Sequence, residues 1–308
     1  MSLFTGLSAF PLTPMSADRV DEAAFAAIMQ RLVAASVDSI TALGSTGSYA
    51  YLTQEERASV TKLAVDNAGD VPVFIGVGAL RTSHMLENVS VAERAGAAAV
   101  LVAPVSYQPL THDEVFDVFR AATERSSLPV IVYDNPRTTH FTFDLDLYAR
   151  IAALPGIASI KIPGVPGDPA EAEAHVSRIR AVIPPHVTIG VSGDQSAATG
   201  LVAGCDAWYS VLGGTLPDQA LALTRAAQSV RAGDPQSADR LRTVTSQLAP
   251  LLDLFTELGG SLRPIAAVAE LLGYAEPSCL PLPVQGLGAA DRDLVARALD
   301  VMSINAHN

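Results

Sequence analysis

Short runs of apolar and β-branched residues recur along the chain and alternate with longer amphipathic stretches. The runs begin roughly every 25 to 35 residues, which is the spacing of strand–helix units in a parallel sheet. One amphipathic stretch carries Phe25, Ile28, Met29 and Leu32 at helical spacing, so it predicts a helix with one apolar face. The eight predicted strands are Leu7–Phe10, Ser39–Leu43, Val71–Val77, Ala98–Ala103, Leu128–Tyr133, Ala158–Ile162, Val187–Val191 and Ala207–Val211.

Eight near-equal repeats predict an α/β chain folded as a (β/α)8 TIM barrel, in which a ring of helices surrounds a closed parallel barrel. An open doubly wound sheet is the alternative, but it does not require eight such repeats. The strand pattern stops after Pro217, so we predict a barrel over residues 1–218 and a C-terminal helical domain over residues 219–308. The predicted helices of that domain are Gln219–Arg231, Gln236–Leu252, Leu262–Leu272 and Asp291–Met302.

The amino-acid composition limits the class of protein that the chain can be and the partners that it can bind. With 49% hydrophobic and 17% charged residues the chain reads as globular, and its net charge of -12 disfavours a nucleic-acid partner. Neither a basic leader with an apolar core nor an apolar run long enough to cross a bilayer is apparent, so no membrane partner is expected. The two cysteines, Cys205 and Cys279, lie far apart, and neither they nor the histidines show metal-ligand spacing. We therefore expect a cytoplasmic protein without a metal site.

Only two of the 20 basic residues are lysines, Lys62 and Lys161. Because arginine provides every other positive charge, a remaining lysine is a candidate for chemistry that needs an amine. Lys161 lies in an otherwise apolar strand, and if Ala158 and Ile160 face the outer helices, Ser159 and Lys161 face the barrel interior. Burial there favours the neutral amine, which attacks a ketone to form an imine. The alternative is a lysine that extends to solvent at the strand end.

Barrel enzymes carry their chemistry at the C-terminal ends of the strands, where this chain places polar residues and glycines. Tyr133 ends the strand before that of Lys161, so it is either a proton shuttle or a core tyrosine bonded to the backbone. Ser45 and Thr46 stand between two glycines at a strand-to-helix turn, which suits a bound carboxylate. Arg137 is a candidate for a second carboxylate or a distal hydroxyl, or else a surface arginine. The candidate substrate-binding residues are Thr46, Gly47, Ser106, Tyr107, Arg137 and Ser210.

Five sequence blocks together resemble the dihydrodipicolinate synthase/N-acetylneuraminate lyase family, from Gly6 to Leu287. They are Phe10-Pro11-Leu12-Thr13-Pro14, Gly44-Ser45-Thr46-Gly47, Gly76-Val77-Gly78-Ala79, Tyr133-Asp134-Asn135-Pro136, and Lys161 with Gly193-Asp194. The resemblance implies an eight-fold barrel with a C-terminal helical domain, usually a homotetramer, and no cofactor. It implies that Lys161 forms a Schiff base with a pyruvate-like 2-oxo acid and that Tyr133 transfers protons. It also implies that Ser45 and Thr46 bind the carboxylate, and that Ser45 passes protons to Tyr133.

Three positions depart from the family pattern. Ser48 replaces the usual glutamate, Ser106 replaces the relay tyrosine of the synthase with Tyr107 one step later, and Arg137 lies one residue closer to its proline than the substrate arginine of the synthase. These departures disfavour a dedicated dihydrodipicolinate synthase and favour a Schiff-base lyase or aldolase acting on pyruvate or a pyruvate-derived 2-oxo sugar acid. The alternatives are a dehydratase or decarboxylase of a 2-oxo-3-deoxy sugar acid by the same imine, the synthase itself, and a barrel that binds a 2-oxo acid without turnover. A phosphate-binding isomerase that uses Gly213-Gly214 is a further alternative.

Overall fold

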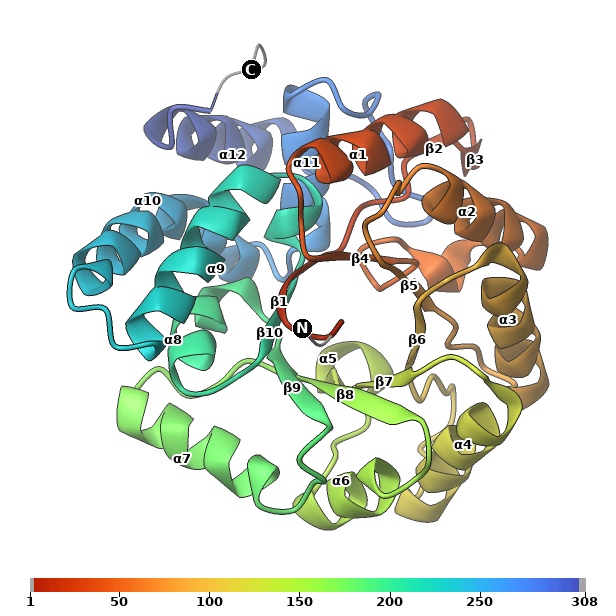
Figure 1. Ribbon diagram of the computed structural model, residues 1–308. Helices are drawn as coiled ribbons and strands as arrows, with labels where there is room; N and C mark the ends of the chain where they lie inside the picture. The colour runs from red at the N-terminus through yellow and green to blue at the C-terminus, as the bar shows by residue number, and fades with distance from the viewer. Residues whose placement is uncertain (1–2, 305–308) are drawn as a thin grey trace.

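The computed structural model describes residues 3–304 and contains eight parallel strands closed into a barrel. Each strand pairs with its neighbours in chain order, and β1 pairs with both β10 and β4, which closes the ring and leaves no open edge. This confirms the predicted (β/α)8 TIM barrel (Figure 1). The barrel strands are β1 (Gly6–Ala9), β4 (Ser39–Ala42), β5 (Val73–Gly76), β6 (Ala99–Val102), β7 (Val130–Tyr133), β8 (Ile157–Ile162), β9 (Thr188–Val191) and β10 (Ala207–Ser210).

Helices surround the barrel, and their end residues explain where several of them begin and stop. Thr53 and Thr111 each start a helix with a capping box, in which Glu56 or Glu114 returns the hydrogen bond. Helix α3 stops at Gly96, which adopts the left-handed conformation with a φ of 87°. The outer helices are α1 (Glu22–Ala34), α2 (Gln54–Asp66), α3 (Thr82–Ala95), α4 (His112–Arg125), α6 (Leu145–Ala152), α7 (Pro169–Arg180), α8 (Ala197–Val202) and α9 (Pro217–Arg231).

Shorter elements occupy the connections between strands and helices. A two-stranded antiparallel hairpin follows β1, and single turns of helix follow four of the barrel strands near their C-terminal ends. These short turns bring polar residues to the end of the barrel where the candidate site lies. The elements are β2 (Met15–Ser16), β3 (Arg19–Val20), η1 (Tyr49–Tyr51), α5 (Pro136–Thr139), η2 (Asp194–Ser196) and η3 (Leu212–Gly214).

The apolar core has two layers. The larger layer lies between the barrel and the helices, and a smaller cluster fills the barrel interior. In that interior cluster Phe10 packs edge-on against Tyr209, with the ring centroids 5.9 Å apart. The hydroxyl of Tyr209 is hydrogen-bonded to Ser159 Oγ at 2.7 Å, so this polar group has a partner although it is buried.

Strand β8 shifts its register against β7. Val130 pairs with Ile157, but the next residue, Ile131, pairs with Ser159, so Ala158 is an extra residue in β8. Ile157 and Ile160 both pack in the outer layer, an odd spacing that strict alternation does not allow. The extra residue therefore switches the phase of the strand. The expectation that Ala158 faces the outer helices is wrong, because this residue packs against the interior cluster.

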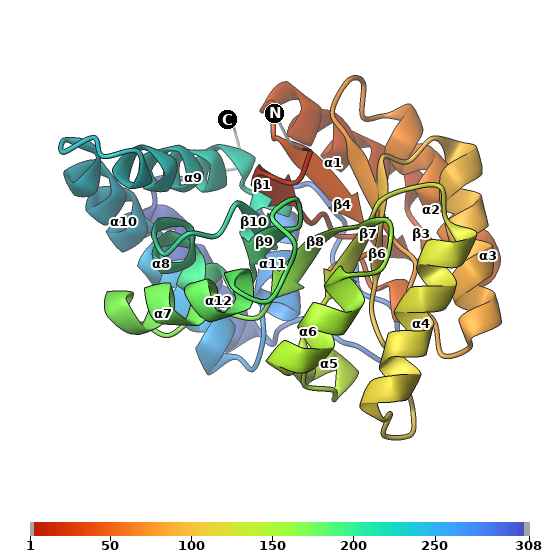
Figure 2. The same cartoon turned by 60° about the horizontal axis from the view of Figure 1, so that its bottom comes forward.

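Three more helices follow the barrel: α10 (Ser237–Glu257), α11 (Leu262–Leu271) and α12 (Ala289–Val301). Helix α9 contacts β1, α8 and α10, and both views show α10 beside α9 at one side of the barrel (Figures 1 and 2). The predicted domain division at residue 218 falls inside α9. Because α9 packs on the barrel like the other outer helices, we propose that the helical domain starts after it.

Candidate active site

Lys161 and Tyr133 lie side by side on neighbouring strands of the barrel. They are register partners on β8 and β7, and Lys161 Nζ is 4.2 Å from the centre of the Tyr133 ring. The same nitrogen is 5.6 Å from the centre of the Phe10 ring, which belongs to the interior cluster. Lys161 is only 5% exposed. Its amine is thus enclosed in the barrel, at the end of the strand where barrel chemistry occurs.

Burial lowers the pKa of Lys161, because the ammonium form loses its hydration. The negative charges of Tyr133, Asp194 and Asp134 act in the opposite direction but do not outweigh burial. The result is an amine that loses its proton more easily than a solvated lysine does. A neutral amine is the form that attacks a carbonyl carbon.

The Tyr133 hydroxyl makes two side-chain hydrogen bonds. It is bonded to Ser45 Oγ at 2.8 Å, and Asn135 Nδ2 donates to it at 2.8 Å. Burial acts to raise the pKa of Tyr133, but the charge of Lys161 and the hydrogen bonds with Ser45 and Asn135 outweigh it, so the pKa is lowered. A phenol with a lowered pKa beside an amine is suited to proton transfer.

The turn after β4 places Ser45 against Tyr133 through close backbone packing. Leu43 has a φ of 57°, in the left-handed region, and a Cβ on Gly76 would lie 1.8 Å from its carbonyl oxygen. A Cβ on Gly44 would lie 2.6 Å from the Phe10 ring. Glycine at both positions is therefore required by close approach. The predicted carboxylate-binding residue Thr46 is buried in the same turn.

A small cavity of about 10 Å³, roughly the space of one water molecule, borders this turn and the Tyr133 ring. Its other walls come from the ends of β5 and β6. The cavity lies next to the hydroxyl pair of Ser45 and Tyr133. The lining residues are Leu43, Gly44, Ser45, Tyr49, Gly76, Gly78, Leu101, Ala103 and Tyr133.

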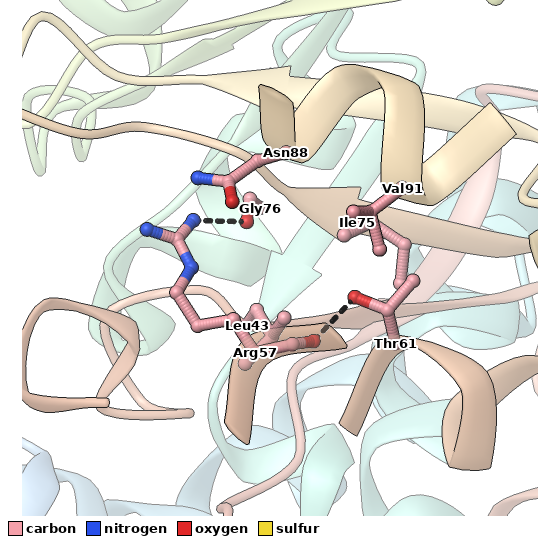
Figure 3. A pocket seen from close by; sticks show the side chains of 7 residues that line it. All are labelled: Leu43, Arg57, Thr61, Ile75, Gly76, Asn88 and Val91. Atoms are coloured by element: carbon pink, nitrogen blue, oxygen red, sulfur yellow. Dashed lines mark hydrogen bonds between the residues drawn. The ribbon is translucent and has the colours of Figure 1, made fainter. Parts of the chain in front are cut away.

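Arg57 binds the backbone at Gly76 and Gly78, which form part of the cavity wall. This buried guanidinium donates to the carbonyls of Gly76 at 3.0 Å and Gly78 at 2.9 Å, and Asn88 Nδ2 donates to the carbonyl of Val77 between them at 3.1 Å. Figure 3 shows the Arg57 guanidinium directed at Gly76, with Asn88 on the same side and Thr61 bonded to the Arg57 carbonyl. Burial lowers the pKa of Arg57 to about 10. Three consecutive carbonyls at the C-terminal end of β5, those of Gly76, Val77 and Gly78, are thus bound by side chains from α2 and α3.

The other predicted substrate-binding residues are not directed into the cavity. Ser106 Oγ is bonded to its own turn at Gln108, and Tyr107 is 89% exposed. Arg137 is exposed, and its Nη2 donates to the Gly259 carbonyl at 3.0 Å, in the loop after α10. The structure thus brings Lys161, Tyr133 and Ser45 together and leaves these three at the rim or on the surface.

Ser210 and the glycines after β10 serve local packing. Tyr209 faces the barrel interior, so the side chain of the next residue, Ser210, faces away from it. Ser210 Oγ accepts a hydrogen bond from the Gly213 N–H at 2.8 Å. A Cβ on Gly214 would lie 2.0 Å from the Phe10 carbonyl oxygen. Gly47 is packed similarly, with the Leu43 backbone 3.1 Å from the position of a Cβ. The Gly213 amide is thus already bonded within the turn, which disfavours the phosphate-binding alternative.

Two buried carboxyls follow the strands on either side of β8. Asp194, after β9, accepts hydrogen bonds from Trp208 Nε1 at 3.0 Å and from the backbone N–H of Leu212 at 2.7 Å. Asp134, after β7, accepts one from the Tyr148 hydroxyl at 2.5 Å. Burial raises the pKa of each carboxyl to about 6. The sequence reasoning gave no role to Asp134, Asn135 or Arg57, although the first two lie in a quoted block.

Residues 3–304 show neither a metal-binding cluster nor a membrane-spanning helix. No group of three or more His, Cys, Asp or Glu side chains within that range is arranged to bind a metal ion. None of the helices described is both long and apolar enough to cross a membrane.

Known proteins match this chain in sequence and in structure over nearly its whole length. The model of the Dihydrodipicolinate synthetase family matches residues 3–301. A 4-hydroxy-tetrahydrodipicolinate synthase from Hyphomonas neptunium (strain ATCC 15444) is 34% identical over 98% of this chain and 100% of its own length. A solved dihydrodipicolinate synthase from Agrobacterium tumefaciens str. C58 is 42% identical, with a TM-score of 0.91 over 97% of this chain and 98% of that chain. A putative dihydrodipicolinate synthetase from Pseudomonas aeruginosa is 27% identical, with a TM-score of 0.86 over 97% of this chain and 99% of that chain.

Proposed function

Because this chain belongs to the dihydrodipicolinate synthetase family, we propose that it is a class I lyase that forms a Schiff base between Lys161 and pyruvate or a pyruvate-derived 2-oxo acid. The observation that carries the proposal is the enclosed Lys161 amine, 4.2 Å from the centre of the ring of a tyrosine whose hydroxyl is bonded to Ser45. A buried amine, a phenol and a hydroxyl-lined turn are the groups that imine chemistry on a small carboxylate needs.

In the proposed reaction, Lys161 Nζ attacks the ketone carbon of the 2-oxo acid. The nitrogen–carbon bond forms, the carbonyl oxygen takes up protons and leaves as water, and the protonated imine remains. Tyr133 and Ser45 would carry these protons, and the N–H groups and hydroxyls of the Ser45–Thr46 turn would bind the carboxylate. In the cleavage direction the iminium accepts the electron pair of the bond that breaks next to it, and the enamine that forms then takes up a proton at that carbon. In the reverse direction the iminium first loses a proton from the neighbouring carbon, and the resulting enamine attacks the aldehyde.

Reductive trapping tests the imine directly. With pyruvate and borohydride, we expect a reduced pyruvyl adduct on the peptide that contains Lys161, detected by mass spectrometry. The substitution Lys161→Arg keeps a positive charge but removes the nucleophilic amine, so it should abolish trapping.

The chain offers a matched control, because its other lysine, Lys62, lies on α2 and is ion-paired with Asp66 at the surface. Lys62→Arg should therefore trap pyruvate like the unmodified protein. An adduct on Lys62 alone, or none in the unmodified protein, would contradict the Schiff-base proposal.

The second candidate is the 4-hydroxy-tetrahydrodipicolinate synthase reaction for which the relatives are named. The names of those relatives favour it. Ser48, Ser106 and Arg137 disfavour it, because they depart from the pattern of the synthase, and Arg137 donates to Gly259 rather than into the cavity. For this reason we place a lyase or aldolase acting on a 2-oxo sugar acid first.

Product analysis separates the remaining reactions. A retro-aldol lyase releases pyruvate and an aldehyde, whereas a dehydratase or decarboxylase of a 2-oxo-3-deoxy sugar acid yields a dehydrated or shortened oxo acid. A synthase consumes pyruvate and an aldehyde. Pyruvate binding with no turnover on such a panel would indicate a barrel that binds a 2-oxo acid without catalysis.

We also infer that the protein is a cytoplasmic homotetramer, as the family resemblance implies. Three large apolar side chains are exposed on consecutive loops after β4, β5 and β6: Tyr51 at 51%, Leu80 at 67% and Tyr107 at 89%. Contacts between copies would remove this surface from water. Light scattering should give four times the chain mass of 32.1 kDa, and a monomer mass would contradict the inference.

A further inference from the structure

Two aromatic rings face the Lys161 amine inside the barrel. Lys161 Nζ lies over the ring of Tyr133, 4.2 Å from its centre, and over the ring of Phe10, 5.6 Å from its centre. Both distances fall within the ~6 Å at which a cation is attracted to the face of an aromatic ring. The chemistry proposed above uses the Tyr133 hydroxyl, but it gives the Phe10 ring no role.

Contacts on several sides hold the Phe10 ring in place. The backbone N–H of Phe10 donates to the Ser210 carbonyl at 2.9 Å, and a Cβ on Gly214 would lie 2.0 Å from the Phe10 carbonyl oxygen. A Cβ on Gly44 would lie 2.6 Å from a ring carbon, so the turn after β4 lies against the ring. Tyr209 packs edge-on against the same ring. Because Phe10 is also buried, its ring is a fixed part of the barrel interior.

A positive charge on Lys161 Nζ has little hydration and no ion pair. Burial of the side chain removes most of the water that would solvate the charge. Within residues 3–304 Lys161 makes no ion pair, whereas the other lysine, Lys62, is paired with Asp66 at the surface. The face of an aromatic ring carries partial negative charge. The two rings beside Nζ therefore supply close stabilisation of a cation at this position.

We propose that Phe10 is a positioning residue whose ring face, together with that of Tyr133, stabilises positive charge on Lys161 Nζ and on the iminium formed from it. This inference rests on the proposed Schiff-base function and adds to it a surface that binds the cationic intermediate. The iminium nitrogen is the former Nζ, so a ring fixed beside the amine also lies beside the charge of the intermediate. Phe10 has no proton to transfer, so its contribution is electrostatic.

A packing role for Phe10 can be separated from this electrostatic one. Phenylalanine with one, two or three ring fluorines, incorporated at position 10, keeps nearly the same shape but withdraws electron density from the ring face, which weakens its attraction for a cation stepwise. Phe10→Leu removes the ring and keeps an apolar side chain. The matched control position is Phe74, which belongs to the same interior cluster and stacks on Phe4, with the ring centroids 5.2 Å apart. Within the described residues no cation lies over the Phe74 ring.

The scarcity of lysine makes the measurement direct. Protein grown with lysine labelled with ¹³C at Cε should give one resonance each from Lys62 and Lys161, and Lys161→Arg assigns them by removing one. The pH titration of the Lys161 resonance gives the pKa of its amine. The acidic groups that act on this amine, Tyr133, Asp134 and Asp194, are the same in every variant. This measurement needs no substrate, so it can fail independently of the trapping experiment.

We expect each added fluorine at position 10 to lower the pKa of Lys161, by about half a pH unit with three fluorines, a threefold change in the ionisation constant. Phe10→Leu should lower it at least as far. At a pH where the free amine is neutral, the pyruvate concentration for half-maximal borohydride trapping should rise by a similar factor, because the iminium loses the same attraction. Fluorinated rings at position 74 should leave both quantities unchanged, and Lys62 should titrate alike in every variant.

An unchanged Lys161 pKa across the series of fluorinated rings at position 10 would overturn the proposal. Equal shifts from positions 10 and 74 would also overturn it, since a general change in packing would then explain both. If Phe10→Leu does not fold, the fluorinated series decides, because it retains the ring. Absence of a pyruvyl adduct on Lys161 in the unmodified protein would instead reject the Schiff-base function and leave the measured effect of the ring on the ammonium group standing.

Discussion

The Tyr133 hydroxyl lies between Ser45 and Asn135, and a phenylalanine in its place would retain the ring while removing the proton carrier. We expect Tyr133→Phe to lower kcat by about 10² to 10⁴-fold, the usual contribution of a positioned acid or base. Lys161 remains, so borohydride should still trap pyruvate on it, more slowly. Steady-state kinetics of the lyase reaction with mass spectrometry of the adduct checks both expectations.

Tyr209→Phe is the matched control for that variant, because it removes a buried hydroxyl bonded to Ser159 in the same barrel interior. Both variants leave a serine hydroxyl without its partner, at a cost of about 1–3 kcal/mol in the free energy of unfolding. If Tyr209→Phe reduced kcat as much as Tyr133→Phe, loss of packing rather than proton transfer would explain the effect.

Single residues differ in how far the sequence alone can identify them. Lys161 was predictable because lysine is rare here and this one interrupts an apolar strand. Arg57 was not, because an arginine in a helix normally faces solvent, and only the fold shows its guanidinium between two carbonyls. Arg137 is a different case, because its position after a strand end left both a substrate contact and a surface arginine open, and in the structure it donates to the Gly259 carbonyl.

At the scale of elements, the end of β5 controls the turn after β4 through backbone contact. A Cβ on Gly76 would lie 1.8 Å from the Leu43 carbonyl oxygen, so Gly76→Ala must displace the turn that carries Ser45. We expect a loss of about 1–3 kcal/mol in the free energy of unfolding, typical of overpacking, together with weaker pyruvate binding. Denaturant unfolding and titration with pyruvate would measure these effects.

Gly167→Ala is the comparison, because no atom lies within 4 Å of the position of its Cβ. It should keep the stability and the pyruvate affinity of the unmodified protein. Equal losses in the two variants would show that the contact with Leu43 is not what matters.

The periodic pattern located the strands and helices well, because each element buries one face or lies wholly in the core. The predicted strand Leu128–Tyr133 differs from β7 (Val130–Tyr133) only at its start. The predicted helix Gln236–Leu252 stops short of the end of α10, which continues past Leu252 to Glu257. The register shift at Ala158 was not predictable, because it depends on the pairing of β8 with β7 rather than on the β8 sequence.

At the scale of the whole molecule, buried carboxyls should shape the dependence of stability on pH. The pKa values of Asp134 and Asp194 are raised from 3.8 to about 6 in the folded protein. The folded state therefore binds these protons more tightly than the unfolded chain does, and the free energy of unfolding falls as the pH rises from about 4 to about 6. Each carboxyl contributes up to about 3 kcal/mol to this fall.

We therefore expect Tm to be higher at pH 5 than at pH 7.5, measured by calorimetry. Glu93 and Glu114, whose pKa values are lowered by hydrogen bonds from Ser127 and Thr111, act in the opposite sense, because the stability that they contribute is lost as the pH falls below about 4.5. Asp134→Asn should flatten the change between pH 5 and 7.5. A Tm that rises steadily from pH 5 to pH 7.5 would contradict this sign.

The barrel as a whole was predictable from its eight repeats, but the placement of the C-terminal helices was not. Arg137 and Gln195 attach loops at the active end of the barrel to the end of α10, through the Gly259 carbonyl and through the Leu252 carbonyl. These contacts join positions 122 and 57 residues apart in the chain. Neither spacing nor hydropathy encodes such pairs, since both bonds are made to backbone oxygens that every residue carries.

The register shift in β8 makes the direction of the Lys161 side chain depend on the number of residues in the strand. Ala158 supplies no functional group, yet the residue inserted at this point decides whether Lys161 faces inward or outward. The number of residues between Ile157 and Lys161 therefore sets the direction of the amine, whatever side chain packs at position 158. If this strand were moved into another barrel, its length would have to be kept for the lysine to face the interior.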